Sequence, residues 1–329
     1  QRRMTVTMRT TALALAAALG LTAAPAGAEK WDMPAAYAAS NYHTQTAIQF
    51  AEAVTAATDG ELEIVVHPSG SLFKGGEIKR AVQTGQAQIG ERLISALGNE
   101  DPLYEIDALP FLATSFDAAW DLYQASRPEL EKLLDSQNLV LLYAVPWPPQ
   151  GLYTKMAVDE AADMQGVKFR AYNAATARLA ELMGAVPTQI EAAELSQAFA
   201  TGVVESMISS GSTGYDRKLW EHTQYWYDVQ AWLPKNMVVV NKQAWNGLDD
   251  ETRAIVRGAA AMAERAGWAK ARELADWYKE QLAANGMEIL PPSDALRADF
   301  EQIGQTMTEE WLERAGEAGR AVIEAYRAM

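Results

Sequence analysis

Short apolar runs alternate with amphipathic segments along most of the chain, and this alternation constrains the possible fold more than any other feature. Residues 61–67 are rich in β-branched side chains and stop at Pro68, which is typical of a strand. The preceding residues, 40–58, begin with a Ser–Asn cap and carry apolar side chains at helical spacing. Because strands that alternate with helices are buried on both faces of their sheets, the pattern predicts an α/β fold with mixed, mostly parallel sheets.

The same alternation predicts the remaining elements. We expect further helices at residues 76–84, 116–136, 174–183 and 192–200, and a helical tail at 293–329. We expect further strands at residues 87–90, 139–145, 152–156, 167–171, 203–209, 237–241 and 287–290. A chain of 329 residues with this many elements predicts roughly two domains.

Residues 249–284 contain no Pro and predict one unusually long helix, which ends at Asn285-Gly286, a pair typical of helix ends. Such a helix would run on the order of 50 Å, longer than one domain of this size needs. We therefore expect it to bridge both domains.

The start of the chain predicts an export signal. Three arginines lie within the first nine residues, residues 12–24 form an uncharged apolar run, and an Ala-Gly-Ala site follows. We expect a signal peptide over residues 1–28, cleavage near Ala28-Glu29, and a periplasmic protein. The alternative is a membrane anchor, but the run has about 13 residues against the roughly 20 needed to span a bilayer. We expect no stable membrane insertion.

Composition excludes several function classes. The chain has 43 acidic and 28 basic residues, a formal net charge of −15, which argues against a nucleic acid partner. It has no Cys, and its three His are not at metal-ligand spacing, so we expect no metal and no cofactor. Phosphate-loop, zinc-protease and hydrolase motifs are also absent from the sequence, so we expect no enzyme.

Residues 164–204 hold the most specific pattern in the chain. In order, they contain Gly166-Val167-Lys168-Phe169-Arg170, Asn173-Ala174-Ala175-Thr176, Glu194 and Thr201-Gly202-Val203-Val204. This series resembles the central signature of the DctP-type solute-binding proteins of tripartite ATP-independent periplasmic (TRAP) transporters. Weaker matches upstream and downstream extend the resemblance over essentially the whole mature chain.

The resemblance implies a two-domain periplasmic-binding-protein fold, type II-like, with a ligand cleft between the domains. We expect domain I at residues 29–148 and 235–275, and domain II at residues 149–234 and 276–329. The resemblance also implies a small organic acid as ligand and the TRAP membrane permease as partner. The domains would close over the ligand by a hinge motion.

Arg170 is the first candidate for ligand contact, because the resemblance implies that the Arg ending the G-x-K-x-R strand pairs with the ligand carboxylate. A guanidinium group offers a planar fork of donors that matches a carboxylate. An Arg at the end of an apolar strand must also find an anion to offset its desolvation. The alternative is an internal ion pair with Glu194.

Two departures from the family pattern bear on the ligand. Sialic-acid-binding members carry an Arg and an Asn where this chain has Gln150 and Ser209, so a highly polar sugar acid is less expected. The surroundings are apolar and aromatic, which suits a monocarboxylate with an apolar or aromatic body. The aromatic candidates are Trp147, Tyr153, Tyr172 and Trp232. For the two tryptophans, packing in a domain core is the alternative.

The remaining candidates are polar. Asn173 belongs to the motif, Ser209 and Ser210 would supply hydroxyl donors, and Tyr42 lies at a predicted helix N-terminus. Arg92 is either a second cation in the cleft or, as we favour, an ion-pair partner of Glu91.

Other functions stay open from the sequence alone. The ligand could be a sugar acid or a sulfonate, or the protein could present its ligand to a sensor. A secreted enzyme acting on a small acid is the remaining alternative, and it would need Glu194 and Glu91 as its acid–base pair.

Overall fold

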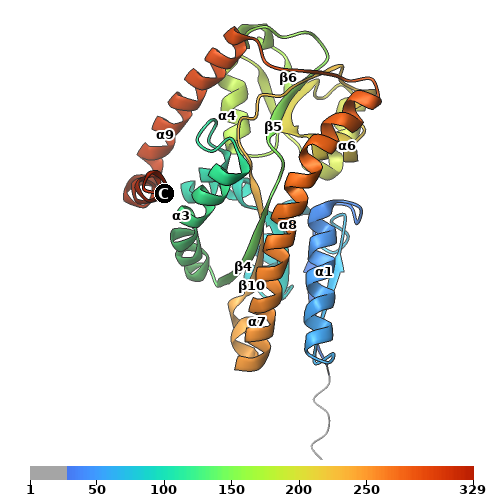
Figure 1. Cartoon of the computed structure of the whole chain (residues 1–329), viewed down its shortest axis with the longest axis vertical. Coiled ribbons are helices and arrows are strands. Elements are labelled where there is room, and N and C mark those ends of the chain that lie inside the picture. The colour runs from blue at the N-terminus through green and yellow to red at the C-terminus, as the bar shows by residue number, and fades with distance from the viewer. Residues whose placement is uncertain (1–27) are drawn as a thin grey trace, which may run out of the picture.

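A computed structural model describes residues 28–329, so the expected signal peptide lies outside the described residues, apart from its last position. The chain forms two α/β lobes (Figure 1). The first lobe holds a two-stranded sheet, β1-β2, and a three-stranded sheet, β3-β10-β4. The second lobe holds one six-stranded sheet in the order β11-β9-β5-β8-β6-β7.

The elements of the first lobe come from two parts of the chain. Its strands are β1 (Glu29–Pro34), β2 (Leu62–His67), β3 (Ile89–Leu93), β4 (Leu139–Pro146) and β10 (Lys235–Asn241). Its helices are α1 (Tyr42–Ala57), α2 (Ile78–Gln83), α3 (Phe116–Ser136) and α7 (Lys242–Gly247). Large aromatic side chains from β1, α1 and β4, namely Trp31, Phe50 and Tyr143, are almost fully buried in its core.

The second lobe is more contiguous in sequence. Its strands are β5 (Gln150–Thr154), β6 (Lys168–Ala171), β7 (Val186–Gln189), β8 (Ser206–Ser210), β9 (Tyr225–Tyr227) and β11 (Glu288–Leu290). Its helices are α4 (Ala174–Leu182), α5 (Leu195–Ala200) and α6 (Gly211–Asp216).

The sheets are mixed, as expected for the fold class. β6 pairs in parallel with both β7 and β8, and β1 pairs in parallel with β2. β10 runs antiparallel to β3 and β4, and β5 runs antiparallel to β8 and β9. All four strands at the crossings between lobes belong to antiparallel pairs: the chain passes from β4 into β5, and from β9 back into β10.

The predicted long helix exists as α8 (Asp250–Ala284), and it bridges both lobes (Figure 1). It packs on α1 and β4 of the first lobe and on α6 of the second. Gly267 permits close contact with β4, because a Cβ atom at this position would lie 2.5 Å from Val145 Cγ2. The two crossings and α8 therefore join the lobes.

The helical tail is α9 (Asp294–Arg327), interrupted at Gly316, whose φ of 60° and ψ of −136° are not helical. Its C-terminal part packs against α3 of the first lobe. Trp311 Nε1 also donates to the carbonyl oxygen of Pro102, which lies in the segment before α3. The expected domain boundaries stay a prediction, and this packing favours placing the end of residues 276–329 with the first lobe. Within residues 28–329, no helix is both long and apolar enough to cross a membrane.

Candidate ligand-binding site

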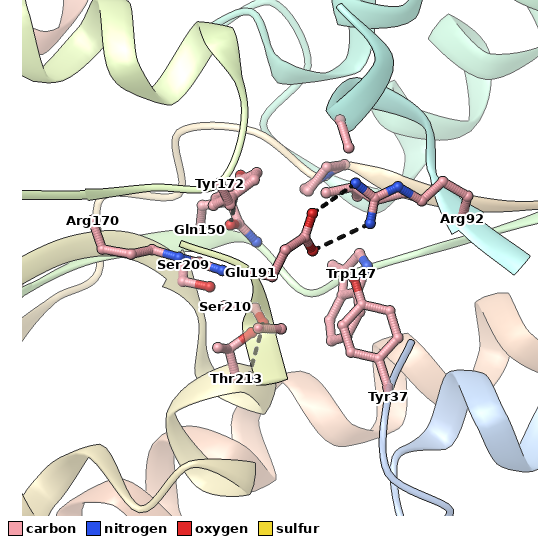
Figure 2. Close-up of a pocket in the computed structure, with 14 residues that line it drawn as sticks. Tyr37, Arg92, Trp147, Gln150, Arg170, Tyr172, Glu191, Ser209, Ser210 and Thr213 are labelled. Carbon is pink, nitrogen blue, oxygen red and sulfur yellow. Dashed lines mark hydrogen bonds and ion pairs between the residues drawn. The ribbon is translucent and has the colours of Figure 1, made fainter. Parts of the chain in front are cut away.

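A cavity of about 460 Å³, counting its open mouth, lies where the two lobes face each other. The first lobe and the crossings contribute Tyr37, Arg92, Leu93, Ala96, Trp147 and Pro234 to its wall. The second lobe contributes Gln150, Arg170, Tyr172, Glu191, Ala192, Ser209, Ser210 and Thr213. In Figure 2, Arg170 and Arg92 enter from opposite sides, with Glu191 between them.

Arg170 is a buried cation without an anionic partner of its own. It is 3% exposed, its Nε donates to the carbonyl oxygen of Ile190 at 2.9 Å, and its Cζ lies 5.1 Å from the ring centroid of Tyr172. Burial lowers its pKa to about 10, so it remains charged at neutral pH. Among residues 28–329, no carboxylate lies within ion-pairing distance of it, and the alternative partner Glu194 is exposed. Its terminal nitrogens are therefore available to an anion.

A row of hydrogen bonds holds the wall beneath this guanidinium group. Trp232 Nε1 donates to the Tyr172 hydroxyl at 3.0 Å, and that hydroxyl donates to Gln150 Oε1 at 3.1 Å. Gln150 Nε2 donates in turn to the carbonyl oxygen of Pro148 at 3.0 Å. The row fixes the ring of Tyr172 against Arg170 and orients the amide of Gln150.

Arg92 forms an ion pair with Glu191, so the favoured pairing with Glu91 was wrong. Arg92 Nη2 and Nη1 lie 3.0 and 3.3 Å from the two carboxylate oxygens of Glu191, a bidentate pair that joins β3 to the segment after β7 (Figure 2). Glu91 points elsewhere because side chains alternate along β3, and its Oε1 accepts from Asn236 Nδ2 at 3.1 Å. Arg92, the second cation of the cleft, is therefore paired with a carboxylate of the opposite lobe.

Trp147 forms an aromatic wall that is held from behind. It is 5% exposed, and its ring packs edge-on against Tyr37 with the centroids 4.8 Å apart. Its Nε1 donates to Asn236 Oδ1 at 2.8 Å, and Asn236 bonds Glu91. Burial raises the pKa of Glu91 to about 7. Glu91 and Glu194, the acid–base pair that an enzyme would need, do not line the cavity.

The two serines lie at the end of β8. Both line the cavity and both are buried. Ser210 is the N-cap of α6, where its Oγ accepts from the Thr213 backbone N–H at 3.2 Å. The Ser209 hydroxyl is directed toward the space in front of Arg170 (Figure 2).

Four sequence candidates do not line the cavity. Asn173 caps α4, because its Oδ1 accepts from the Thr176 backbone N–H. Tyr153 is buried in the second lobe, where its hydroxyl donates to the carbonyl oxygen of Ser210. Tyr42 donates to the carbonyl oxygen of Pro146, and Trp232 lies behind Tyr172. A residue that caps a helix or packs in an aromatic core has the same residue type and sequence position as one that binds a ligand. The sequence alone therefore did not distinguish these two roles.

Sequence reasoning missed Tyr37, Glu191 and Thr213. Glu191 lies two residues after β7, at the carboxyl end of a parallel strand, which is where ligands bind in open α/β sheets. Predicting β7 would have singled it out. Tyr37 lies in the segment between β1 and α1, and no motif marks it.

The fold and the site define a two-domain α/β protein with a cavity between its lobes that is lined by a guanidinium group without an ion-pair partner. The chain belongs to the DctP family, the bacterial extracellular solute-binding proteins of family 7, whose sequence model matches residues 35–314. The resemblance to solute-binding proteins of TRAP transporters is thereby confirmed. This family agrees with three expectations from the sequence: a small organic acid as ligand, the TRAP permease as partner, and an extracytoplasmic location. The members of this family are solute-binding proteins.

Three relatives illustrate the similarity. DctP6 of Bordetella pertussis, an extracytoplasmic solute receptor binding pyroglutamic acid, is 50% identical with a TM-score of 0.90, covering 91% of this chain and 100% of its own. A marine metagenome TRAP solute-binding protein specific for pyroglutamate is 53% identical with a TM-score of 0.91, covering 92% and 99%. The ectoine/5-hydroxyectoine-binding protein UehA of Ruegeria pomeroyi is 24% identical, covering 95% of this chain and 94% of its own.

Proposed function

We propose that this chain captures pyroglutamate outside the cytoplasm and delivers it to a TRAP permease. The observation that carries the proposal is the buried, unpaired guanidinium group of Arg170 in the cavity between the lobes. Two proteins about half identical to this chain bind pyroglutamate, which supports this particular acid. Pyroglutamate is a monocarboxylate with a compact lactam ring, and it fits the expected acid with an apolar body better than a sugar acid does.

In this proposal the ligand carboxylate pairs with Arg170. Desolvation disfavours the charged guanidinium group, and an anion that reaches its free nitrogens offsets this cost. Arg170 is almost fully buried, and the low effective dielectric of such a site strengthens the pair. The lactam ring would lie against the flat faces of Trp147 and Tyr37, and its N–H and C=O groups would meet polar atoms of the wall such as the Gln150 amide.

Closure of the lobes follows from the same geometry. The ligand contacts residues of both lobes only when they face each other, so its binding free energy favours the closed form. Two cross-lobe contacts support a closed state: the Arg92–Glu191 pair, and the bond from Asn41 Nδ2 to Asp216 Oδ2 at 2.7 Å.

Calorimetric titration of residues 29–329 tests the proposal. We expect binding of pyroglutamate and none of 2-pyrrolidinone, which has the ring without the carboxylate. Arg170→Gln should lower the affinity by about 30-fold or more, the scale of losing one partner of a buried charge pair. Arg265→Gln, which removes an exposed Arg on α8, is the matched control and should bind like the wild type. Unchanged affinity in the Arg170 variant would contradict the role of this residue.

A further inference from the structure

The Arg92–Glu191 pair is more than a contact between lobes, because both side chains line the same cavity as Arg170. Arg92 is 6% exposed and Glu191 is 38% exposed at the side chain. The backbone at Gly75 packs against the pair from behind, since a Cβ atom there would lie 2.8 Å from Arg92 Nη1 and 2.9 Å from Glu191 Oε2. The pair is therefore in close contact with this backbone and also faces the cavity.

The charges of the wall can be counted. In the part of the chain that the structure describes, the charged side chains lining the cavity are two guanidinium groups, Arg92 and Arg170, and one carboxylate, Glu191. The two lining tyrosines, Tyr37 and Tyr172, are neutral at physiological pH because burial raises the pKa of each hydroxyl. One positive charge is left without a protein partner, and it belongs to Arg170.

We propose that Glu191 sets the number of anionic groups that the site accepts, and restricts the ligand to a monocarboxylate by occupying Arg92. This inference rests on the proposed function and names the feature that excludes dicarboxylates. A ligand with a single carboxylate neutralises Arg170 and leaves the Arg92–Glu191 pair intact. A second carboxylate would meet Glu191 instead of a free cation, and like charges at close range repel each other.

Glu191→Gln tests the proposal, because it keeps the shape of the side chain and frees the charge of Arg92. We expect the variant to bind glutarate, a dicarboxylate with the same number of carbons as pyroglutamate, at least about tenfold more tightly than the wild type does. Its affinity for pyroglutamate should fall, because the cross-lobe ion pair is lost. Melting temperature reports whether the variant folds, and the half-exposed position of Glu191 favours folding.

Two further variants distinguish this mechanism from others. Glu194→Gln removes the same charge from an exposed position three residues away and should leave both affinities unchanged. The double variant Arg92→Gln, Glu191→Gln returns the cavity wall to one net positive charge, as in the wild type, but without the ion pair. The gain in glutarate affinity of the single variant Glu191→Gln should therefore disappear.

The outcomes separate this inference from the proposed function. If the wild type binds pyroglutamate but Glu191→Gln gains no affinity for glutarate, the inference is overturned and the proposed function stands. An equal gain in Glu194→Gln would also overturn it, because net charge alone would then explain the effect. If the wild type does not bind pyroglutamate, the proposed function fails, and the glutarate affinities of the wild type and Glu191→Gln still decide the inference.

Discussion

Glu91→Gln should stabilise the protein at alkaline pH and leave its stability nearly unchanged at acidic pH. Glu91 is 3% exposed, and burial raises the pKa of its carboxyl group from 4.5 to about 7. The hydrogen bond donated by Asn236 opposes this rise without reversing it. The difference in pKa between the unfolded and folded states corresponds to about 3 kcal/mol.

The direction of the pH effect on stability follows because the pKa of Glu91 is raised in the folded state and not in the unfolded chain. Between pH 4.5 and about 7, folded Glu91 holds a proton that the unfolded chain has released, so stability falls as pH rises through this window. Glutamine does not titrate, and its side-chain oxygen can still accept from Asn236. We expect Glu91→Gln to exceed the wild type in free energy of unfolding by up to about 3 kcal/mol at pH 8, and to match it within about 1 kcal/mol at pH 4.5.

Urea unfolding followed by circular dichroism at both pH values measures this difference. Glu194→Gln, which removes an exposed carboxylate, serves as the control and should show no such pH dependence. A Glu91→Gln variant that is less stable than the wild type at pH 8, or that differs from it equally at both pH values, would refute the reasoning.

Two other substitutions test the site wall and the core of the first lobe. Trp147→Ala should weaken pyroglutamate binding by about 1 kcal/mol or more in calorimetry. The substitution removes an aromatic wall of the cavity and leaves Asn236 Oδ1 without its donor. An unchanged affinity would assign Trp147 to packing alone. Lys235→Met should cost about 3–5 kcal/mol in urea unfolding, because it leaves the carboxylate of Asp107 buried without its ammonium partner. A loss below about 1 kcal/mol would contradict the importance of this pair.

Much of the fold could be predicted from the sequence because the elements with strong local signals are also the long ones. α3 covers the predicted residues 116–136, and α8 begins one residue after its predicted start. The sequence did not predict β1, β7 or β9. β7 contains Pro187 and is partly exposed, and β9 has three residues, so neither carries a periodic pattern; both become strands through their pairing partners β6 and β5.

The candidate site was predictable where it coincides with a motif. Arg170 and Tyr172 lie in or beside the G-x-K-x-R strand, and Gln150 with Trp147 lies on the crossing before it. Glu191 could not be found in the same way, because its significance depends on Arg92, which is 99 residues away in the sequence. Sequence proximity instead suggested Glu91 as the partner of Arg92, and strand geometry separates those neighbours.

A crystal structure of residues 29–329 grown with pyroglutamate tests the central claim most directly. The account predicts electron density for the ligand in the cavity between the lobes, with its carboxylate oxygens within hydrogen-bonding distance of the terminal nitrogens of Arg170 and the Arg92–Glu191 pair intact. A carboxylate bound away from Arg170, or a cavity that stays empty at saturating pyroglutamate, would contradict it.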